Sequence, residues 1–170
     1  MPVEDRVVLP GGFGTVAALE DRAFLTEIGR LGTGAQYLTS VCTGSLLLAA
    51  AGLLHGRRAA CHWAWRDLLS AFAVAPDPAR VVRDGNVITG GGVTAGIDMA
   101  LTVMAELAGV DYAQAVKLSL EYAPEPPFDS GRPERARPET VAAVQQCVAA
   151  MAAERAAAVD RAARLLVGHS

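Results

Sequence analysis

Apolar residues occur along the first half of the chain in short blocks with two different spacings. Residues 6–9 and 37–41 are short runs rich in apolar and β-branched residues, typical of buried strands. Residues 17–30 carry apolar side chains at helical spacing, and residues 45–51 consist of strong helix formers. Because strands and helices alternate in this way, we predict an α/β fold with a mainly parallel sheet covered on both faces.

The middle of the chain continues this alternation. Residues 58–62 predict a further strand, and residues 63–72 predict the helix that follows it. Residues 80–83 and 86–89 predict a hairpin with residues 84–85 in its turn. The hairpin leads directly into a run of three glycines.

Helices dominate the second half. A helix begins at Thr94 or Ala95, a second covers residues 111–121, and a long helix covers residues 139–166. A proline-rich loop over residues 124–138 separates the last two helices. We therefore expect a single domain over residues 1–170, with its core at about residues 6–123.

Composition excludes several classes of protein. The chain has 170 residues, 52% of them hydrophobic, and a net charge of -3, so no basic face for nucleic acid is expected. No apolar run reaches the roughly 18 to 20 residues needed to cross a bilayer. The first residues also lack the pattern of a secretory signal, so we expect a cytoplasmic protein that binds neither nucleic acid nor membrane.

One of the three cysteines lies where a thiol can be reactive. Cys42 falls between the strand over residues 37–41 and the following helix, and a helix N-terminus favours the thiolate. Cys61 and Cys147 are expected to be core residues. The spacing of the three fits neither a disulfide framework nor a metal site, and the alternative for Cys42 is an ordinary buried thiol.

Backbone amides beside Cys42 are candidates for stabilising negative charge. The amide of Thr43 belongs to the same turn, and the loop amides near Gly12 and Phe13 provide a second donor. The glycines of this loop allow close approach between backbone segments.

Three further residues are predicted at the border of the site. His62 ends the strand over residues 58–62, where an imidazole either moves protons or simply packs beside Trp63. Gly91 and Val93 follow the hairpin; the glycine run lacks the lysine of a nucleotide loop and indicates a tight turn near the site.

Several motifs together resemble the ThiJ/PfpI superfamily, and within it the isocyanide hydratase group. They are residues 7–14 (VVLPGGFG), 40–45 (SVCTGS), 60–63 (ACHW), 89–98 (TGGGVTAGID) and 120–129 (LEYAPEPPFD). The resemblance extends from about Val7 into the final helix. Because separate motifs occur in the same order, we treat it as specific.

The resemblance implies a flavodoxin-like three-layer sandwich, of the class I glutamine amidotransferase-like type, which usually forms a homodimer. It implies Cys42 as the nucleophile, and Thr43 as the residue that contacts the intermediate or orders the water. The implied substrate is a small isocyanide, which the cysteine and water convert to an N-substituted formamide. It implies no metal and no organic cofactor.

The chain departs from the family at its amino end. Family members carry an earlier strand-helix-strand segment, which supplies an acidic residue to the cysteine, whereas six residues precede Val7 here. We therefore expect an N-terminally truncated sandwich whose activity as it stands is doubtful.

Two other functions compete with the hydratase interpretation. Similar domains precede the DNA-binding part of AraC-type regulators and sense small ligands without turnover, although no helix pair of that kind follows Gly131. Related cysteine sites also act on aldehydes or peroxide. A peptidase is disfavoured, because Thr43 occupies the place where peptidases of the superfamily have histidine.

Overall fold

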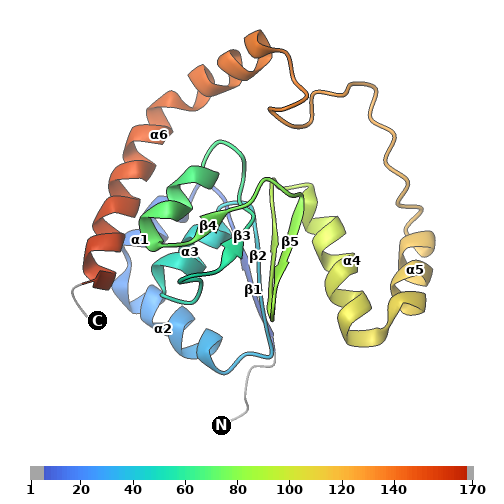
Figure 1. The fold of residues 1–170 in the computed structure, drawn as a ribbon, viewed down its shortest axis with the longest axis horizontal. Helices are drawn as coiled ribbons and strands as arrows, with labels where there is room; N and C mark the ends of the chain where they lie inside the picture. The colour runs from blue at the N-terminus through green and yellow to red at the C-terminus, as the bar shows by residue number, and fades with distance from the viewer. Residues whose placement is uncertain (1–5, 168–170) are drawn as a thin grey trace.

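The computed structural model describes residues 6–167 and has a four-stranded sheet between two layers of helices (Figure 1). The strand order is β1-β2-β6-β5, with bounds Arg6–Pro10, Tyr37–Val41, Val87–Gly90 and Val81–Asp84. Strands β1, β2 and β6 are parallel, and β5 pairs with β6 as an antiparallel hairpin. The predicted α/β sandwich with a mainly parallel sheet is confirmed.

The two helical layers lie on opposite sides of this sheet (Figure 1). One layer contains α1 (Thr15–Glu20), α2 (Arg22–Thr33), α3 (Gly44–Ala50) and α6 (Pro138–Val167). The other contains α4 (Ala95–Ala108) and α5 (Val110–Ser119). Residues 120–137 then lead back across the molecule to α6.

The core lies between the sheet and α6. All seven residues of α3 are buried, and Leu46 and Leu48 have no exposed surface. From the outer side, α6 contributes Ala158 and Val159, which are also fully buried. Helix α3 is therefore enclosed by the sheet on one side and by α1 and α6 on the other.

The helix predicted over residues 17–30 is two helices. Asp21 adopts an extended conformation (φ -85°, ψ 96°) between α1 and α2, and its carboxylate accepts a hydrogen bond from the Phe24 amide at 3.0 Å. This N-cap begins a new helix in a different direction. Apolar residues keep their helical spacing on both sides of Asp21, so this spacing alone did not reveal the break.

The segment predicted as strand 58–62 and helix 63–72 is less regular. Strand β3 covers only Arg58–Ala59 and pairs with β4 (Ala75–Pro76) outside the main sheet, and η1 (Arg66–Phe72) is a 3₁₀ helix. The Ala60 amide donates to the Thr89 hydroxyl at 2.8 Å rather than to a strand backbone, which ends the pairing.

Two smaller expectations are corrected at the hairpin and in α6. The pairing of Asp84 with Val87 places the turn at residues 85–86, one residue later than predicted, with Gly85 at φ 62°. Cys147 is exposed, not a core residue, because residues 138–150 of α6 are mostly exposed and the later turns make the packing contacts. Cys61 is buried as expected.

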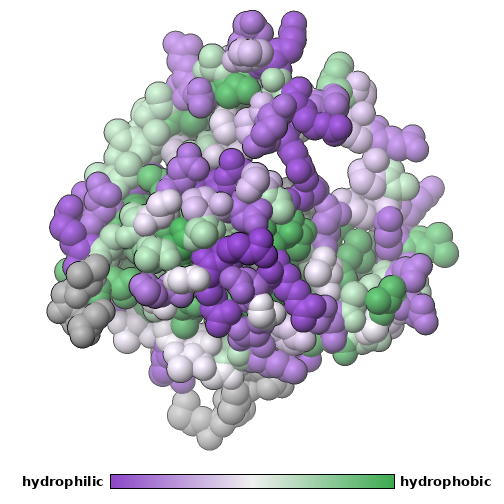
Figure 2. All heavy atoms as spheres, viewed as in Figure 1, coloured by the Kyte–Doolittle hydropathy of each residue, from purple (hydrophilic) through white to green (hydrophobic). Residues whose placement is uncertain are grey.

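The layer of α4 and α5 leaves apolar side chains at the surface, as the green patches over these helices show (Figure 2). Leu118 is 81% exposed, and Val110, Tyr112 and Leu120 are also exposed. Among residues 6–167, no helix combines the length and the apolar character that a membrane span requires.

Candidate active site

Cys42 lies at a sharp turn between β2 and α3. Its φ is 62°, a left-handed conformation that residues other than glycine seldom adopt. The Cys42 amide donates to the Gly90 carbonyl at 3.0 Å, which ties the turn to the end of the neighbouring strand β6. The backbone thus holds the cysteine at the carboxyl edge of the sheet, where open α/β sheets bind ligands.

Two glycines allow the loop after β1 to approach this turn closely. A Cβ atom on Gly44 would lie 2.1 Å from the Leu9 carbonyl oxygen, and one on Gly11 would lie 2.4 Å from the Thr43 amide nitrogen. Neither distance is compatible with any larger residue unless the backbone moves. The Pro-Gly-Gly loop and the cysteine turn are therefore packed backbone to backbone.

A closed set of hydrogen bonds joins these two segments. The Gly12 amide donates to the Thr43 hydroxyl at 3.0 Å, and the Thr15 hydroxyl donates to the Gly12 carbonyl at 2.8 Å. The two hydroxyls lie 2.8 Å apart. Because Thr15 has already used its single hydrogen, Thr43 donates to Thr15 in this pair.

This arrangement bears on the predicted donors for negative charge. The Gly12 amide is engaged with Thr43, so it reaches a substrate only if that bond opens. The Phe13 side chain is 88% exposed and points away from the core, which leaves only its backbone as a candidate. The Thr43 amide favours the thiolate form of Cys42 by hydrogen bonding and so lowers the pKa of this thiol.

The acidity of Cys42 differs from the sequence-based expectation. Burial raises the pKa of the Cys42 thiol above its ordinary value, and this effect exceeds the opposing ones. Hydrogen bonds from the Thr43 amide and hydroxyl lower the pKa, as does the positive charge of Arg155. Since the Thr43 hydroxyl has one hydrogen, a bond to the thiolate replaces its bond to Thr15.

The predicted border residues His62, Gly91 and Val93 line a common cavity of about 300 Å³. The cavity begins next to Gly90, whose carbonyl accepts the Cys42 amide. Its other lining residues include Cys61, Arg66, Arg80 and Glu134. The sequence motifs 60–63 and 89–98 therefore meet in space beside the cysteine turn.

His62 is held as a neutral imidazole. Its ring stacks on Trp63 with 5.9 Å between centroids, and its Nδ1 accepts the Ala64 amide at 3.2 Å. Burial, and secondly the charge of Arg155, lower the pKa of His62 below 6.5. The remaining nitrogen, Nε2, then carries the hydrogen and is a donor rather than a base.

Arg155 is the site residue that sequence reasoning missed. It comes from α6, 113 positions after Cys42, and is only 4% exposed. Its guanidinium lies 4.3 Å from the centre of the Trp65 ring, and Nη2 donates to the Gly12 carbonyl at 3.4 Å. The one available signal was an arginine within a stretch of small residues, and it did not indicate burial, because an arginine on such a helix is normally solvated.

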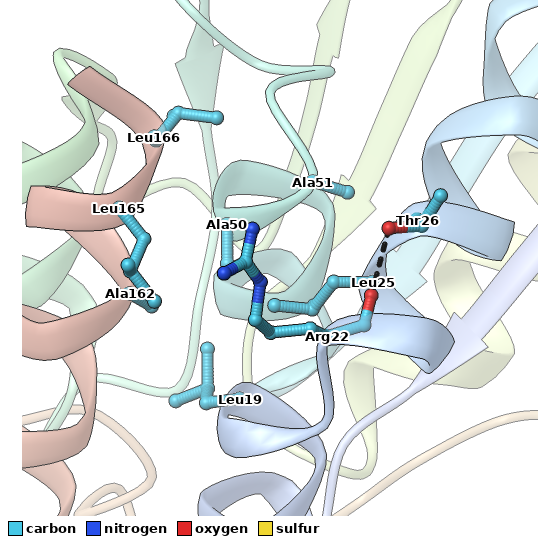
Figure 3. A pocket seen from close by; sticks show the side chains of 9 residues that line it. All are labelled: Leu19, Arg22, Leu25, Thr26, Ala50, Ala51, Ala162, Leu165 and Leu166. Carbon is cyan, nitrogen blue, oxygen red and sulfur yellow. Dashed lines mark hydrogen bonds between the residues drawn. The ribbon is translucent and has the colours of Figure 1, made fainter. Parts of the chain in front are cut away.

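A second cavity, of about 210 Å³, lies at the opposite end of α3 from Cys42 (Figure 3). Leu19 and Leu25 face Ala162 and Leu165 across it, and the Arg22 side chain extends into the space between them. This position is remote from the cysteine turn. Among the described residues, no three His, Cys, Asp or Glu side chains gather closely enough to hold a metal ion.

Comparison with known proteins gives consistent matches. Residues 3–106 match the DJ-1/PfpI family. The chain is 58% identical over 135 residues to an isonitrile hydratase from Pseudomonas putida, which covers 79% of this chain and 59% of that protein. Over 94 residues, it is 38% identical to the HTH-type transcriptional regulator GlxA of Rhizobium meliloti, with 54% of this chain and 28% of that protein covered.

Among solved structures, a ThiJ/PfpI family protein from Pseudomonas syringae matches with a TM-score of 0.87 and 44% identity. The match covers 95% of this chain and 66% of that structure. The chain thus spans about three fifths of the length of the P. putida hydratase and about two thirds of the P. syringae structure.

Proposed function

Because the chain belongs to the DJ-1/PfpI family, we propose that it hydrates isocyanides (R–N≡C, also called isonitriles) to N-substituted formamides, with Cys42 as the nucleophile. The observation that carries the proposal is the placement of Cys42. Its half-buried thiol lies at a left-handed turn beside Thr43, in a chain that is 58% identical over 135 residues to an isonitrile hydratase.

The first step is attack by sulfur on the terminal carbon of the isocyanide. The thiol proton is transferred to that carbon as the S–C bond forms, giving a thioimidate, Cys–S–CH=N–R. The Thr43 amide stabilises the thiolate before attack. Its hydroxyl is available to do the same when it turns from Thr15 toward the sulfur.

The second step is hydrolysis of the thioimidate. Water adds to its carbon, one water hydrogen goes to nitrogen, and the tetrahedral adduct Cys–S–CH(OH)–NH–R forms. When the adduct collapses, the S–C bond breaks, the hydroxyl proton returns to sulfur, and the formamide HC(=O)–NH–R leaves. The net reaction consumes one isocyanide and one water.

The cavity beside Gly91 and Val93 is the proposed place for the R group. It lies next to the backbone that contacts Cys42, and its volume suits a small molecule. A neutral His62 contributes a hydrogen-bond donor to this cavity rather than a general base.

The test is formamide production from a simple aryl isocyanide by the chain and by Cys42→Ala. The proposal requires that formamide production depend on Cys42, so Cys42→Ala should produce none. Cys147→Ala, which changes an exposed cysteine remote from the turn, is the matched control and should retain full activity. A folded chain that alkylates at Cys42 but makes no formamide contradicts the proposal.

A ligand-sensing domain is the second candidate, and the similarity to a transcriptional regulator favours it. In that case an isocyanide or another small electrophile binds in the cavity, and protection of Cys42 from alkylation is measured without product. The thiol-based reaction with aldehydes or peroxide is the remaining alternative, which selective oxidation of Cys42 followed by mass spectrometry detects.

We also propose that the protein acts as a cytoplasmic homodimer. The exposed apolar residues of α5, with Phe128 at 78% exposed, are consistent with a surface covered in an assembly. The molecular mass in solution, measured by light scattering, tests this expectation.

A further inference from the structure

Arg155 is the one charged residue that is buried among residues 6–167, and it contacts the Gly12 loop that packs on the cysteine turn. Burying a guanidinium is unfavourable unless its charge and its hydrogen-bond donors are compensated. A buried arginine in this position therefore needs an explanation.

The contacts of Arg155 compensate it only in part. The face of the guanidinium lies over Trp65 at 4.3 Å, an attractive cation–π arrangement. Its hydrogen bond to the Gly12 carbonyl is long, at 3.4 Å, and Gly12 also accepts the Thr15 hydroxyl at 2.8 Å. Its buried Nε has no hydrogen-bond partner among the described residues.

The groups that surround Arg155 identify its counter-charge. Glu154 is adjacent on α6 but exposed, so solvent screens it. Cys61 is buried, and burial raises the pKa of its thiol so far that it stays neutral. The remaining acidic group that acts on Arg155 is Cys42, which is half-buried and ionisable.

We propose that Arg155 is a positioning residue for Cys42: from α6 it holds the Gly12 carbonyl and places a buried positive charge beside the reactive sulfur. The Gly12 amide in turn holds the Thr43 hydroxyl, so the arginine orders the hydrogen bonds next to the cysteine. Its charge offsets part of the penalty that burial imposes on the thiolate. The inference rests on the proposed function only in taking Cys42 as the reactive group.

The other charged or titratable groups around this pair are His62 and Cys61 after β3, Arg66 from η1, and Glu154 from α6. His62 is neutral, and Cys61 is a thiol across the accessible pH range. A change at Arg155 is therefore expected to act mainly on Cys42, and secondarily on His62.

The experiment measures the rate of Cys42 alkylation by iodoacetamide from pH 5 to 10, resolved by peptide mass spectrometry from Cys61 and Cys147. It needs no isocyanide, so failure of the hydratase proposal does not affect its outcome. For Arg155→Gln we expect a rate about tenfold lower at pH 7, because the anion loses its stabilising charge. The pH profile of the variant should be displaced toward higher pH by about one unit, which corresponds to that tenfold difference in rate.

Three further variants make the result decisive. Arg155→Met removes the same charge and leaves no polar group buried without a partner. It therefore serves as the test if Arg155→Gln does not fold. Arg155→Lys keeps the charge and is expected to restore most of the rate. Arg161→Gln, which removes an exposed arginine of the same helix paired with Glu20, should leave the profile unchanged.

Circular dichroism and thermal unfolding establish that each variant is folded. The inference is overturned if folded Arg155→Gln or Arg155→Met has the pH profile of the unmodified chain. It is also overturned if Arg161→Gln shifts the profile as far as they do, since a remote change in net charge would then suffice.

Discussion

The two helical layers of this protein differ in how far their apolar side chains are buried. In the layer of α1, α3 and α6, Leu48 and Val159 are fully buried, whereas in the layer of α4 and α5, Leu118 is 81% exposed. The cysteine turn begins α3, the most enclosed element, and its neighbours Thr15 and Arg155 come from the same layer. The site thus depends on the tightly packed layer for its geometry, and the cavity wall at Gly91 and Val93 belongs to the loop between β6 and α4 rather than to the other layer.

The largest expected effect is that of Gly44→Ala. The new methyl group would lie 2.1 Å from the Leu9 carbonyl, so the backbone of β1 or of the cysteine turn must move. We expect a loss of about 3 kcal/mol or more in the free energy of unfolding, measured with urea. Gly131→Ala, which meets no atom within 4 Å, is the control and should change stability by less than about 0.5 kcal/mol.

A cavity in the core tests the comparison directly. Leu48→Ala is expected to cost about 3 kcal/mol, since the buried side chain leaves a void that α3 cannot fill. The same substitution in the other layer, Leu118→Ala, should cost the isolated monomer less than about 0.5 kcal/mol. A larger loss that increases with protein concentration would place Leu118 in the interface of the proposed homodimer, because assembly then contributes to the measured stability.

Thr43→Val removes the hydroxyl that joins the two loops. The Gly12 amide loses its acceptor and the Thr15 hydroxyl loses a donor, at a cost of about 2 kcal/mol. Chemical unfolding measures this loss, and Thr26→Val, whose exposed hydroxyl bonds only within α2, is the control. An unchanged stability would mean that the hydrogen-bonded ring is not formed in solution.

His62 is expected to produce the smallest effect, a dependence of stability on pH. Burial lowers the pKa of His62 in the folded protein below the ordinary 6.5, so the unfolded chain binds this proton more readily. The stability that neutral His62 contributes is present above pH 6.5 and is lost as the pH falls through the lowered pKa. His62→Gln should flatten the curve of unfolding free energy between pH 7 and 5, whereas His55→Gln, at an exposed position, should not.

Much of the fold was predictable because local pattern and tertiary position agree. The strand over residues 37–41 and the start of helix α4 were predicted nearly to the residue, since apolar residues recur throughout both segments. The family resemblance is confirmed, and it rests on motifs that cluster around the cysteine turn. The break at Asp21 and the short strand β3 were missed, because side-chain hydrogen bonds decide both and leave no trace in the spacing of apolar residues.

Only part of the candidate site was predicted from the sequence, for a similar reason. Cys42, Thr43 and Gly12 lie in glycine-marked turns at strand ends, where sequence signals are strong. Arg155 lies in an alanine-rich helix, where an arginine is normally solvated, and only the packing of α6 over Trp65 reveals its place. Cys147, on the same helix, was expected in the core and is exposed, since helical periodicity does not tell which turns another element covers.

The sequence by itself determined the alternation of strands and helices, the position of Cys42 at a strand-to-helix turn, and the family. These properties depend on neighbouring residues, through propensity, turn geometry and short motifs. Tertiary structure alone decided that burial raises the pKa of Cys42, that Thr43 and Thr15 close a hydrogen-bonded ring with Gly12, and that Arg155 lies beside them. Charge and hydrogen bonding in a site depend on distance in space, and residues 113 positions apart become neighbours only when the core has formed.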